Sequence, residues 1–194
     1  LLETLAVEDD TVEAHFAMAN LFRKRGELDR ALKVHEHLVR QKHLANADKE
    51  RAIYELGKDF HSAGLYDRAE DMFLRTHKSK KFGVRSINFL MHIFQQTKDW
   101  QQGVALKKVI LKSKDVRLQH VLANFYCELA NIAITKEESI TVFELLEKAK
   151  PVAANLGSIE RQGFYSRATK CFAVVRLGEM RPFGCFILRK GATF

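Results

Sequence analysis

The sequence has little that would interrupt a helix. Only two prolines occur among 194 residues, so backbone hydrogen bonding can continue along most of the chain. Apolar residues make up 46% of the sequence, which supports a buried core and argues against a disordered or fibrous chain. Leu, Ala, Lys, Glu and Arg, which favour helices, are abundant. We therefore predict an all-α protein.

Long apolar runs and cysteine pairs are also missing. No run approaches the roughly 20 apolar residues that cross a bilayer. Cys127, Cys171 and Cys185 are an odd number of widely separated thiols and form no CxxC pair, which argues against a disulfide framework or a zinc ribbon. We expect inert thiols and a reducing compartment. The chain begins without Met and within a helical pattern, so we expect it to be part of a longer protein.

Motifs for catalysis or cofactor binding are absent as well. The sequence has no GxSxG elbow, no P-loop, no dinucleotide-binding glycine motif and no HExxH pair. Of the eight histidines, His15 and His35 take positions that pack against neighbouring helices, and we expect the other six to be solvated. We predict no catalytic residue, no metal site and no cofactor.

The net charge of +8 and the pI near 9.4 fit a nucleic acid, an anionic membrane surface or an acidic protein as partner. Basic residues are scattered among 24 acidic ones, with a single dense run at Lys78, Lys80 and Lys81. No aromatic RNA-binding motif accompanies this run, which argues against nucleic acid. A protein segment of acidic or mixed charge is the favoured partner.

An eight-position pattern recurs along the chain with the same internal spacing. It is carried first by Ala17, Met18, Ala19, Phe22, Gly26, Leu28, Ala31 and His35, and again by Glu55, Leu56, Gly57, Phe60, Gly64, Tyr66, Ala69 and Phe73. A third copy begins at Phe89 and a fourth at Glu128. We place repeats at 12–45, 50–83, 84–117 and 123–156, with partial units at both ends of an array over 1–178. Residues 179–194 form an atypical tail, since Pro182 would break the next helix.

Successive copies of the pattern start 38, 34 and 39 residues apart. These distances are close to the period of about 34 residues that is typical of tetratricopeptide (TPR) repeats, in which each unit is a helix, a tight turn and a second helix. Small residues such as Ala19 and Ala31 let the paired helices approach closely. Gly26 and Gly64 suit the left-handed end of a first helix, and Asp29 and Asp67 could cap the second. We predict a TPR-type α-solenoid of antiparallel helix pairs that forms a right-handed superhelix. A generic helical bundle would lack this fixed register.

Four stretches go beyond the general TPR pattern. They are Thr11 to His15, Asn20 to Arg23, Ala63 to Phe73 and Phe125 to Ala130. In these stretches the chain resembles the bacterial LapB family, also called YciM, over about residues 1–178. The resemblance implies an inner-membrane protein whose TPR array faces the cytoplasm, between an N-terminal membrane helix and a C-terminal metal domain that are both missing here. It also implies an adaptor of lipopolysaccharide synthesis that helps the protease FtsH degrade the deacetylase LpxC. Some members are labelled N-acetylglucosaminyl transferases, but no residue here supports that chemistry.

The TPR register places one set of side chains on the concave face. The predicted groove residues are Phe16, Asn20, Arg23, Lys24, Arg51, Tyr54, Lys58, Arg85, Asn88, His92 and Asn131, and the same register adds Glu13, His61, Gln95 and Asn124. We predict that the asparagine amides form hydrogen bonds with the backbone of a bound peptide and that the basic residues pair with its carboxylates. The two aromatic rings would pack against its apolar side chains.

Several alternatives to this groove hypothesis remain, and one is that the convex face or the loops bind the partner. The chain could serve as a generic assembly scaffold in another pathway, or as the regulatory arm of a glycosyltransferase. It could also associate with copies of itself through apolar helix faces at its ends, around Leu2, Leu5, Phe172 and Val175.

Overall fold

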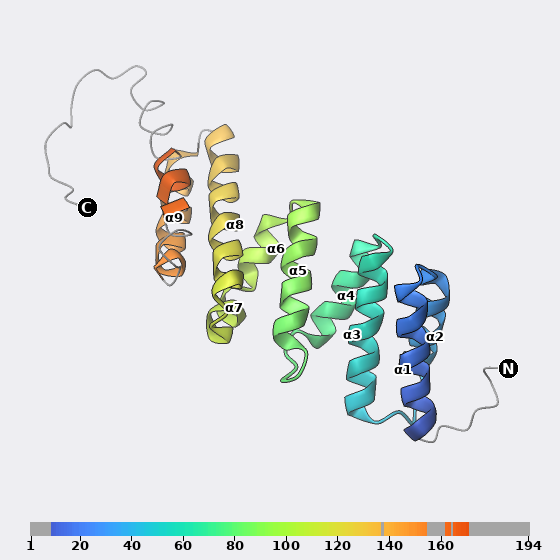
Figure 1. Cartoon of the computed structure of the whole chain (residues 1–194). Helices are drawn as coiled ribbons and strands as arrows, with labels where there is room; N and C mark the ends of the chain where they lie inside the picture. Colours follow the sequence, from blue (N-terminus) through green and yellow to red (C-terminus); the bar gives the residue numbers. More distant parts are fainter. Residues whose placement is uncertain (1–8, 137, 155–161, 164, 171–194) are drawn as a thin grey trace, which may run out of the picture. The chain divides into compact units, whose positions relative to one another are not determined.

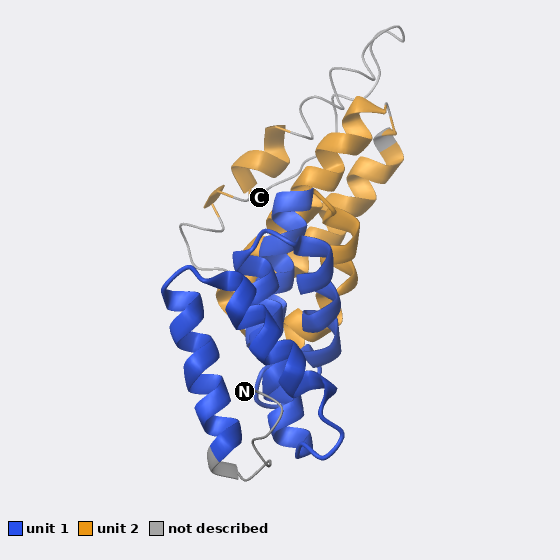
Figure 2. Cartoon of the chain, turned by 90° about the vertical axis from the view of Figure 1, so that its right-hand side faces the viewer, with its two compact units in different colours: residues 1–97 blue, residues 98–194 orange. Residues whose placement is uncertain are grey.

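The computed structural model describes residues 9–136, 138–154, 162–163 and 165–170 (Figure 1). Within these ranges all regular structure is helical and no strand occurs, which confirms the all-α prediction. The chain divides into two compact units, residues 1–97 and 98–194 (Figure 2).

The first unit contains five described helices that pack in chain order, each against the next. They are α1 (Asp9–Lys24), α2 (Leu28–Arg40), α3 (Asn46–Ser62), α4 (Tyr66–Thr76) and α5 (Gly83–Thr97). Three-residue turns join α1 to α2 and α3 to α4, so the two helices of each pair run antiparallel. This is the helix-turn-helix arrangement that the repeat predicts.

The second unit is organised around its longest described helix, α8 (Val116–Thr135). This helix packs against α6 (Trp100–Ala105), α7 (Lys107–Ser113) and α9 (Ser139–Ala153). The side chain of Asp115 caps the start of α8 by accepting from the backbone N–H groups of Arg117 and Leu118, at 2.9 and 3.4 Å. That cap satisfies two donors that the first turn of a helix leaves unpaired.

The second helices of the first unit show why the sequence folds as it does. In α2 the buried residues are Ala31, Val34, His35 and Leu38, which are spaced three and four apart and so form one face. In α4 the buried residues Ala69, Phe73 and Thr76 follow the same spacing. Each helix buries one stripe against its neighbours and exposes the other side.

The turns between paired helices confirm one local prediction and correct another. Gly26 and Gly64 have φ angles of +80° and +74°, the left-handed conformation expected for them. Asp29 and Asp67 do not cap: α2 and α4 begin one residue before them, and no side-chain hydrogen bond caps either start. Each aspartate lies instead in the first turn, where its charge still complements the helix dipole.

The third repeat keeps this turn without a glycine. Lys98 stands where Gly26 and Gly64 stand in the first two copies, and its φ is +59°. A side chain in this region strains the backbone, because Cβ comes too close to the following carbonyl. The repeat register therefore continues through a conformation that lysine rarely adopts.

Small residues allow close helix contacts in both units. Ala19, Ala31 and Ala69 have no exposed surface. A Cβ added at Gly57 would lie 2.9 Å from Cε1 of Phe73, and one added at Gly103 would lie 2.0 Å from Cε2 of Phe125. The aromatic ring thus occupies the space that a side chain would need, most tightly at Gly103.

Several predictions fall outside the described residues. These are the partial first unit at 1–7, the tail at 179–194, Cys171 and Cys185, and the apolar ends around Leu2, Leu5, Phe172 and Val175. Cys127 is a buried thiol on α8. Among the helices that the structure describes, none combines the length and the apolar character that crossing a membrane requires.

Candidate functional site

Ten of the eleven predicted groove residues lie on the first helices of the repeats in unit 1. Helix α1 carries Phe16, Asn20, Arg23 and Lys24, helix α3 carries Arg51, Tyr54 and Lys58, and helix α5 carries Arg85, Asn88 and His92. On each helix they are spaced mainly three or four residues apart, which places them on one side of it. Asn131 lies exposed on α8 and belongs to unit 2.

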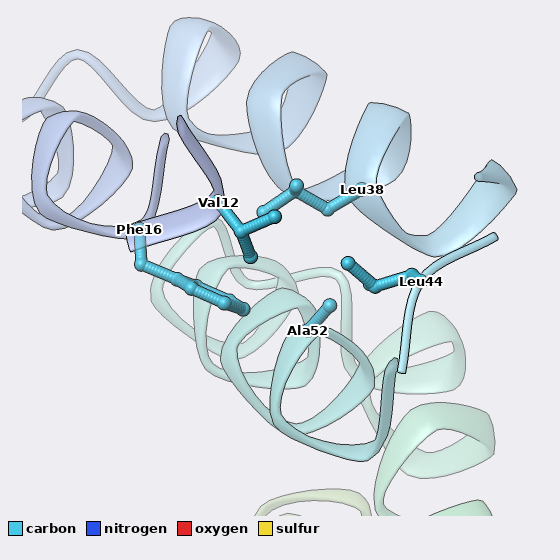
Figure 3. Close-up of a cluster of buried hydrophobic side chains, with 5 residues drawn as sticks. All are labelled: Val12, Phe16, Leu38, Leu44 and Ala52. Carbon is cyan, nitrogen blue, oxygen red and sulfur yellow. The ribbon is translucent and has the colours of Figure 1, made fainter. Parts of the chain in front are cut away.

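Phe16 and Tyr54 are core residues, so their prediction as apolar anchors for a partner is wrong. Phe16 has no exposed surface and packs with Val12, Leu38, Leu44 and Ala52 (Figure 3). Tyr54 is 5% exposed and stacks on Phe82 with 4.8 Å between ring centroids. Both rings turn into the contact with the neighbouring helices, because burying so large an apolar surface there is favourable. Neither is available to a ligand.

Arg23 is fixed by a buried ion network. Its Nη1 atom donates to Oδ1 of Asp59 at 2.8 Å and to the carbonyl of Glu55 at 3.2 Å. Its Nη2 atom donates to Oε2 of Glu55 at 2.5 Å and also to the amide oxygen of Asn20. The Arg23 side chain is 14% exposed. The prediction that Arg23 is open to a partner's carboxylates is therefore wrong, since carboxylates of its own chain already occupy it.

Two further predicted cations are paired at the surface of the same helices. Lys58 donates to both carboxylate oxygens of Glu55, at 3.2 and 3.0 Å. Arg51 donates to Glu13 on α1 and lies over the ring of Phe16, 4.1 Å from its centroid. The basic groove that the sequence predicts is thus a surface of mixed charge.

The carboxylate of Glu55 shows how strongly this pairing acts. Burial alone would raise its pKa, because it disfavours the charged form. The hydrogen bonds from Arg23 and Lys58, together with their positive charges, outweigh burial and hold the pKa of Glu55 below its ordinary value. Glu55 is therefore charged at neutral pH, and it neutralises part of the positive charge around it.

Lys24 and Arg85 are the predicted cations that remain accessible to a partner. Both are exposed, and neither forms an ion pair with any residue in the described part of the chain. Asn88 is also exposed, and its amide donates to the carbonyl of Val84 at 3.1 Å. His92 is exposed beside His61 of α3. These residues, with the paired Arg51 and Lys58, form what we call the α1/α3/α5 surface.

The acidic residues that organise this surface were not among the predicted site residues. Asp59 and Glu55 are absent from the predicted set, and Glu13 was included only as a groove position without a partner. One local signal existed: Glu55 and Lys58 are three residues apart, a spacing that favours an ion pair on a helix. The contact between Arg23 and Asp59 spans 36 residues and has no such signal.

The fold is that of known repeat proteins. The MamA protein of Desulfovibrio magneticus is 18% identical and superposes with a TM-score of 0.52 over 90% of this chain and 98% of its own. A Podospora anserina protein built of TPR-like repeats gives a TM-score of 0.53 at 15% identity, over 90% of this chain and 92% of its own. Together with the helix pairs and the repeat register, these likenesses define a TPR-type α-solenoid.

Sequence relatives then identify the family. The lipopolysaccharide assembly protein B of Escherichia coli K12 is 36% identical over 154 residues, which is 79% of this chain and 40% of that protein. Its Haemophilus influenzae counterpart is 31% identical over 168 residues, 81% of this chain and 42% of that protein. The model of the RbsD / FucU transport protein family matches residues 97–193. The chain belongs to the lipopolysaccharide assembly protein B family and, over residues 97–193, to the RbsD / FucU transport protein family.

The resemblance to LapB is thereby confirmed, while the second match was not predicted. An L-fucose mutarotase of Haemophilus influenzae is 44% identical over 48 residues, 25% of this chain and 33% of that enzyme. The match to the RbsD / FucU model includes most of 179–194, the segment that fits no TPR unit. The two family matches overlap in sequence, because the 154 residues aligned with LapB and the segment 97–193 are together longer than the 194 residues of the chain. The chain spans about two fifths of the length of its LapB relatives.

Proposed function

We propose that this chain is a non-catalytic adaptor of lipopolysaccharide assembly that binds a protein segment of mixed charge on the α1/α3/α5 surface. The observation that carries the proposal is the surface itself: Lys24 and Arg85 are open, whereas Arg51 and Lys58 are held in place by acids of the same chain. Charges fixed before binding lose little side-chain entropy when a partner docks. The identity to relatives named for lipopolysaccharide assembly supplies the pathway.

The family resemblance supplies the partners. By that resemblance the adaptor works on the cytoplasmic side of the inner membrane and promotes degradation of LpxC by FtsH. An acidic side chain of the partner would pair with Lys24 or Arg85, and a basic one with Glu13, which is exposed beside Arg51. Asn88 and His92 would add hydrogen bonds to the backbone of the partner.

The test is a calorimetric titration of purified LpxC, and separately of the soluble part of FtsH, into the wild type and a Lys24→Glu/Arg85→Glu variant. The double reversal should weaken binding because it turns two attractive charges into repulsive ones. We avoid reversing Arg51 and Lys58, since that would place like charges beside Glu13 and Glu55 and disturb the fold. A Lys33→Glu/Lys42→Glu variant is the matched control, because these exposed lysines lie on α2 and in the turn after it.

The outcomes separate the hypotheses. Binding that weakens in the first variant and not in the control supports the proposed surface. Equal binding in all three proteins would move the contact away from this surface. No binding of LpxC or FtsH to the wild type would contradict these partners and favour a generic scaffold.

A second candidate function is the interconversion of the anomeric or ring forms of a sugar by the C-terminal half, which the match to the RbsD / FucU family favours. The relatives there include an L-fucose mutarotase and a D-ribose pyranase. Proton NMR of L-fucose or D-ribose with the full chain would test it, through exchange between the anomeric signals of the sugar. Exchange that is no faster than without protein would contradict this candidate.

A further inference from the structure

Two histidines from different helices of unit 1 turn their ring nitrogens toward each other. Nε2 of His61, on α3, is 3.0 Å from Nδ1 of His92, on α5. The ring centroids are 5.0 Å apart and the planes are inclined by 57°. His92 is exposed and His61 is half-buried against the ring of Phe89, 5.1 Å away. The expectation of a solvated ring agrees with the exposure of His92, whereas His61 is only partly exposed.

The other histidines nearby have different partners. Nδ1 of His35 faces Asp59, Nδ1 of His15 faces the carbonyl of Thr11, and Nε2 of His37 faces the amide of Gln41. All eight histidines of the chain lie in its described part. Among them, only His61 and His92 have ring nitrogens within hydrogen-bond distance of each other.

The spacing of these nitrogens matches that of two ligands on one metal ion. Imidazole nitrogens lie about 2.0–2.1 Å from a bound first-row metal ion, so two of them at a right angle are about 3.0 Å apart and two at a tetrahedral angle about 3.4 Å. The observed 3.0 Å fits the right angle. Square-planar or tetragonal nitrogen ligands are typical of Cu²⁺ and Ni²⁺.

We propose that His61 and His92 form a two-histidine binding site for a divalent late first-row metal ion of the Ni²⁺ or Cu²⁺ type. No third His, Cys, Asp or Glu joins them among the described residues, so water or a bound partner fills the other coordination positions. The hydrogen that lies between the facing nitrogens moves to the far nitrogen of its own ring, and both facing nitrogens then present a lone pair to the ion.

The surroundings of His61 disfavour its protonated form. Burial, followed by the proximity of His92, lowers the pKa of His61. The site requires no partner, so it stands or fails separately from the proposed adaptor function.

Calorimetric titration of NiCl₂ into the full chain, prepared without a histidine tag, tests the proposal. We expect one ion to bind per chain. Loss of a residue that only orients a ligand costs about 10- to 100-fold in metal affinity, so His61→Gln and His92→Gln should each cost at least that much. His77→Gln is the control, because Nδ1 of His77 faces the carbonyl of Leu74, and it should bind Ni²⁺ like the wild type.

Two results would overturn the proposal. One is Ni²⁺ affinity in both Gln variants equal to that of His77→Gln, and the other is a wild type that binds no Ni²⁺. His92 is exposed, so His92→Gln leaves the core intact and stays informative even if His61→Gln folds poorly. Electron paramagnetic resonance with Cu²⁺ gives an independent reading: nitrogen splitting from two imidazoles is expected in the wild type and from one in His92→Gln.

Discussion

Asp59 and His35 form a hydrogen bond in the interior of unit 1, where Oδ2 of the carboxylate lies 2.5 Å from Nδ1 of the ring and neither side chain is exposed. The other oxygen of Asp59 accepts from Arg23 at 2.8 Å. One carboxylate of α3 thus holds both α1 and α2. Such a group is costly to bury and costly to remove once its partners are buried with it.

Replacing Asp59 with Ala should destabilise the protein by about 3–5 kcal/mol, because it removes one of the two carboxylates that pair with Arg23 and leaves Nδ1 of the buried His35 without its hydrogen-bond partner. Urea unfolding followed by circular dichroism measures the change. Glu13→Ala is the control: it removes the pair with Arg51, in which the Glu13 side chain is 64% exposed, and exposed pairs contribute only about 0–1 kcal/mol. Equal effects of the two substitutions would contradict the central role of Asp59.

Gly103→Ala should also destabilise the protein, by about 1–3 kcal/mol, since the added methyl group overlaps the ring of Phe125 and forces it to move. The added Cβ would come within 2.0 Å of that ring. Gly163→Ala has open space around it and should stay within about 0.5 kcal/mol of the wild type. Thermal unfolding of both variants measures these changes. A third variant, Gly103→Ala combined with Phe125→Leu, checks the cause: leucine is smaller than phenylalanine, so the double variant should regain part of the stability that Gly103→Ala loses.

Gly64 offers a test of backbone conformation without any change in packing. No atom lies within 4 Å of a Cβ added there, and its φ is +74°. Gly64→Ala should cost about 1–2 kcal/mol because alanine resists the left-handed region. Gly64→Asn should cost less, since asparagine tolerates that region. If urea unfolding showed the same decrease in the free energy of unfolding for Gly64→Ala and Gly64→Asn, the backbone φ angle would not be the cause.

Acid should remove the contribution of Glu55 to stability. Its pKa is lower in the folded protein than in the unfolded chain, so the unfolded state takes up protons first as the pH falls. The stabilisation is complete above the unfolded pKa, about 4.3, and is lost as the pH falls through the folded value. Thermal unfolding of wild type and Glu55→Gln should therefore differ at pH 7 and converge in acid. A difference that stays constant with pH would contradict this assignment.

Local chemistry was enough to predict the turns of the first two helix pairs. A glycine at a fixed place in a repeat indicates a left-handed residue, and Gly26 and Gly64 have that conformation. The buried stripe of α2 also follows from its spacing alone. Start positions were less secure: Asp29 has the right chemistry for a cap, but α2 begins at Leu28 and its capping position is Glu27. Asp29 is therefore two residues too late to cap the helix.

The candidate site was harder to predict because its contacts join separate helices. Periodicity places Phe16 and Tyr54 on the inner side of their helices, but the neighbouring helix decides whether such a ring is covered. Both rings are covered here. Likewise Arg23 resembles an open cation until α3 brings Asp59 and Glu55 beside it. Pairing between side chains of different repeats leaves no local signal in the sequence.

The lysine at position 98 shows that the left-handed turn of this repeat does not require glycine. Its φ of +59° lies in the same left-handed region as those of Gly26 and Gly64. A consensus that required glycine at this place would count two repeats in the chain and stop.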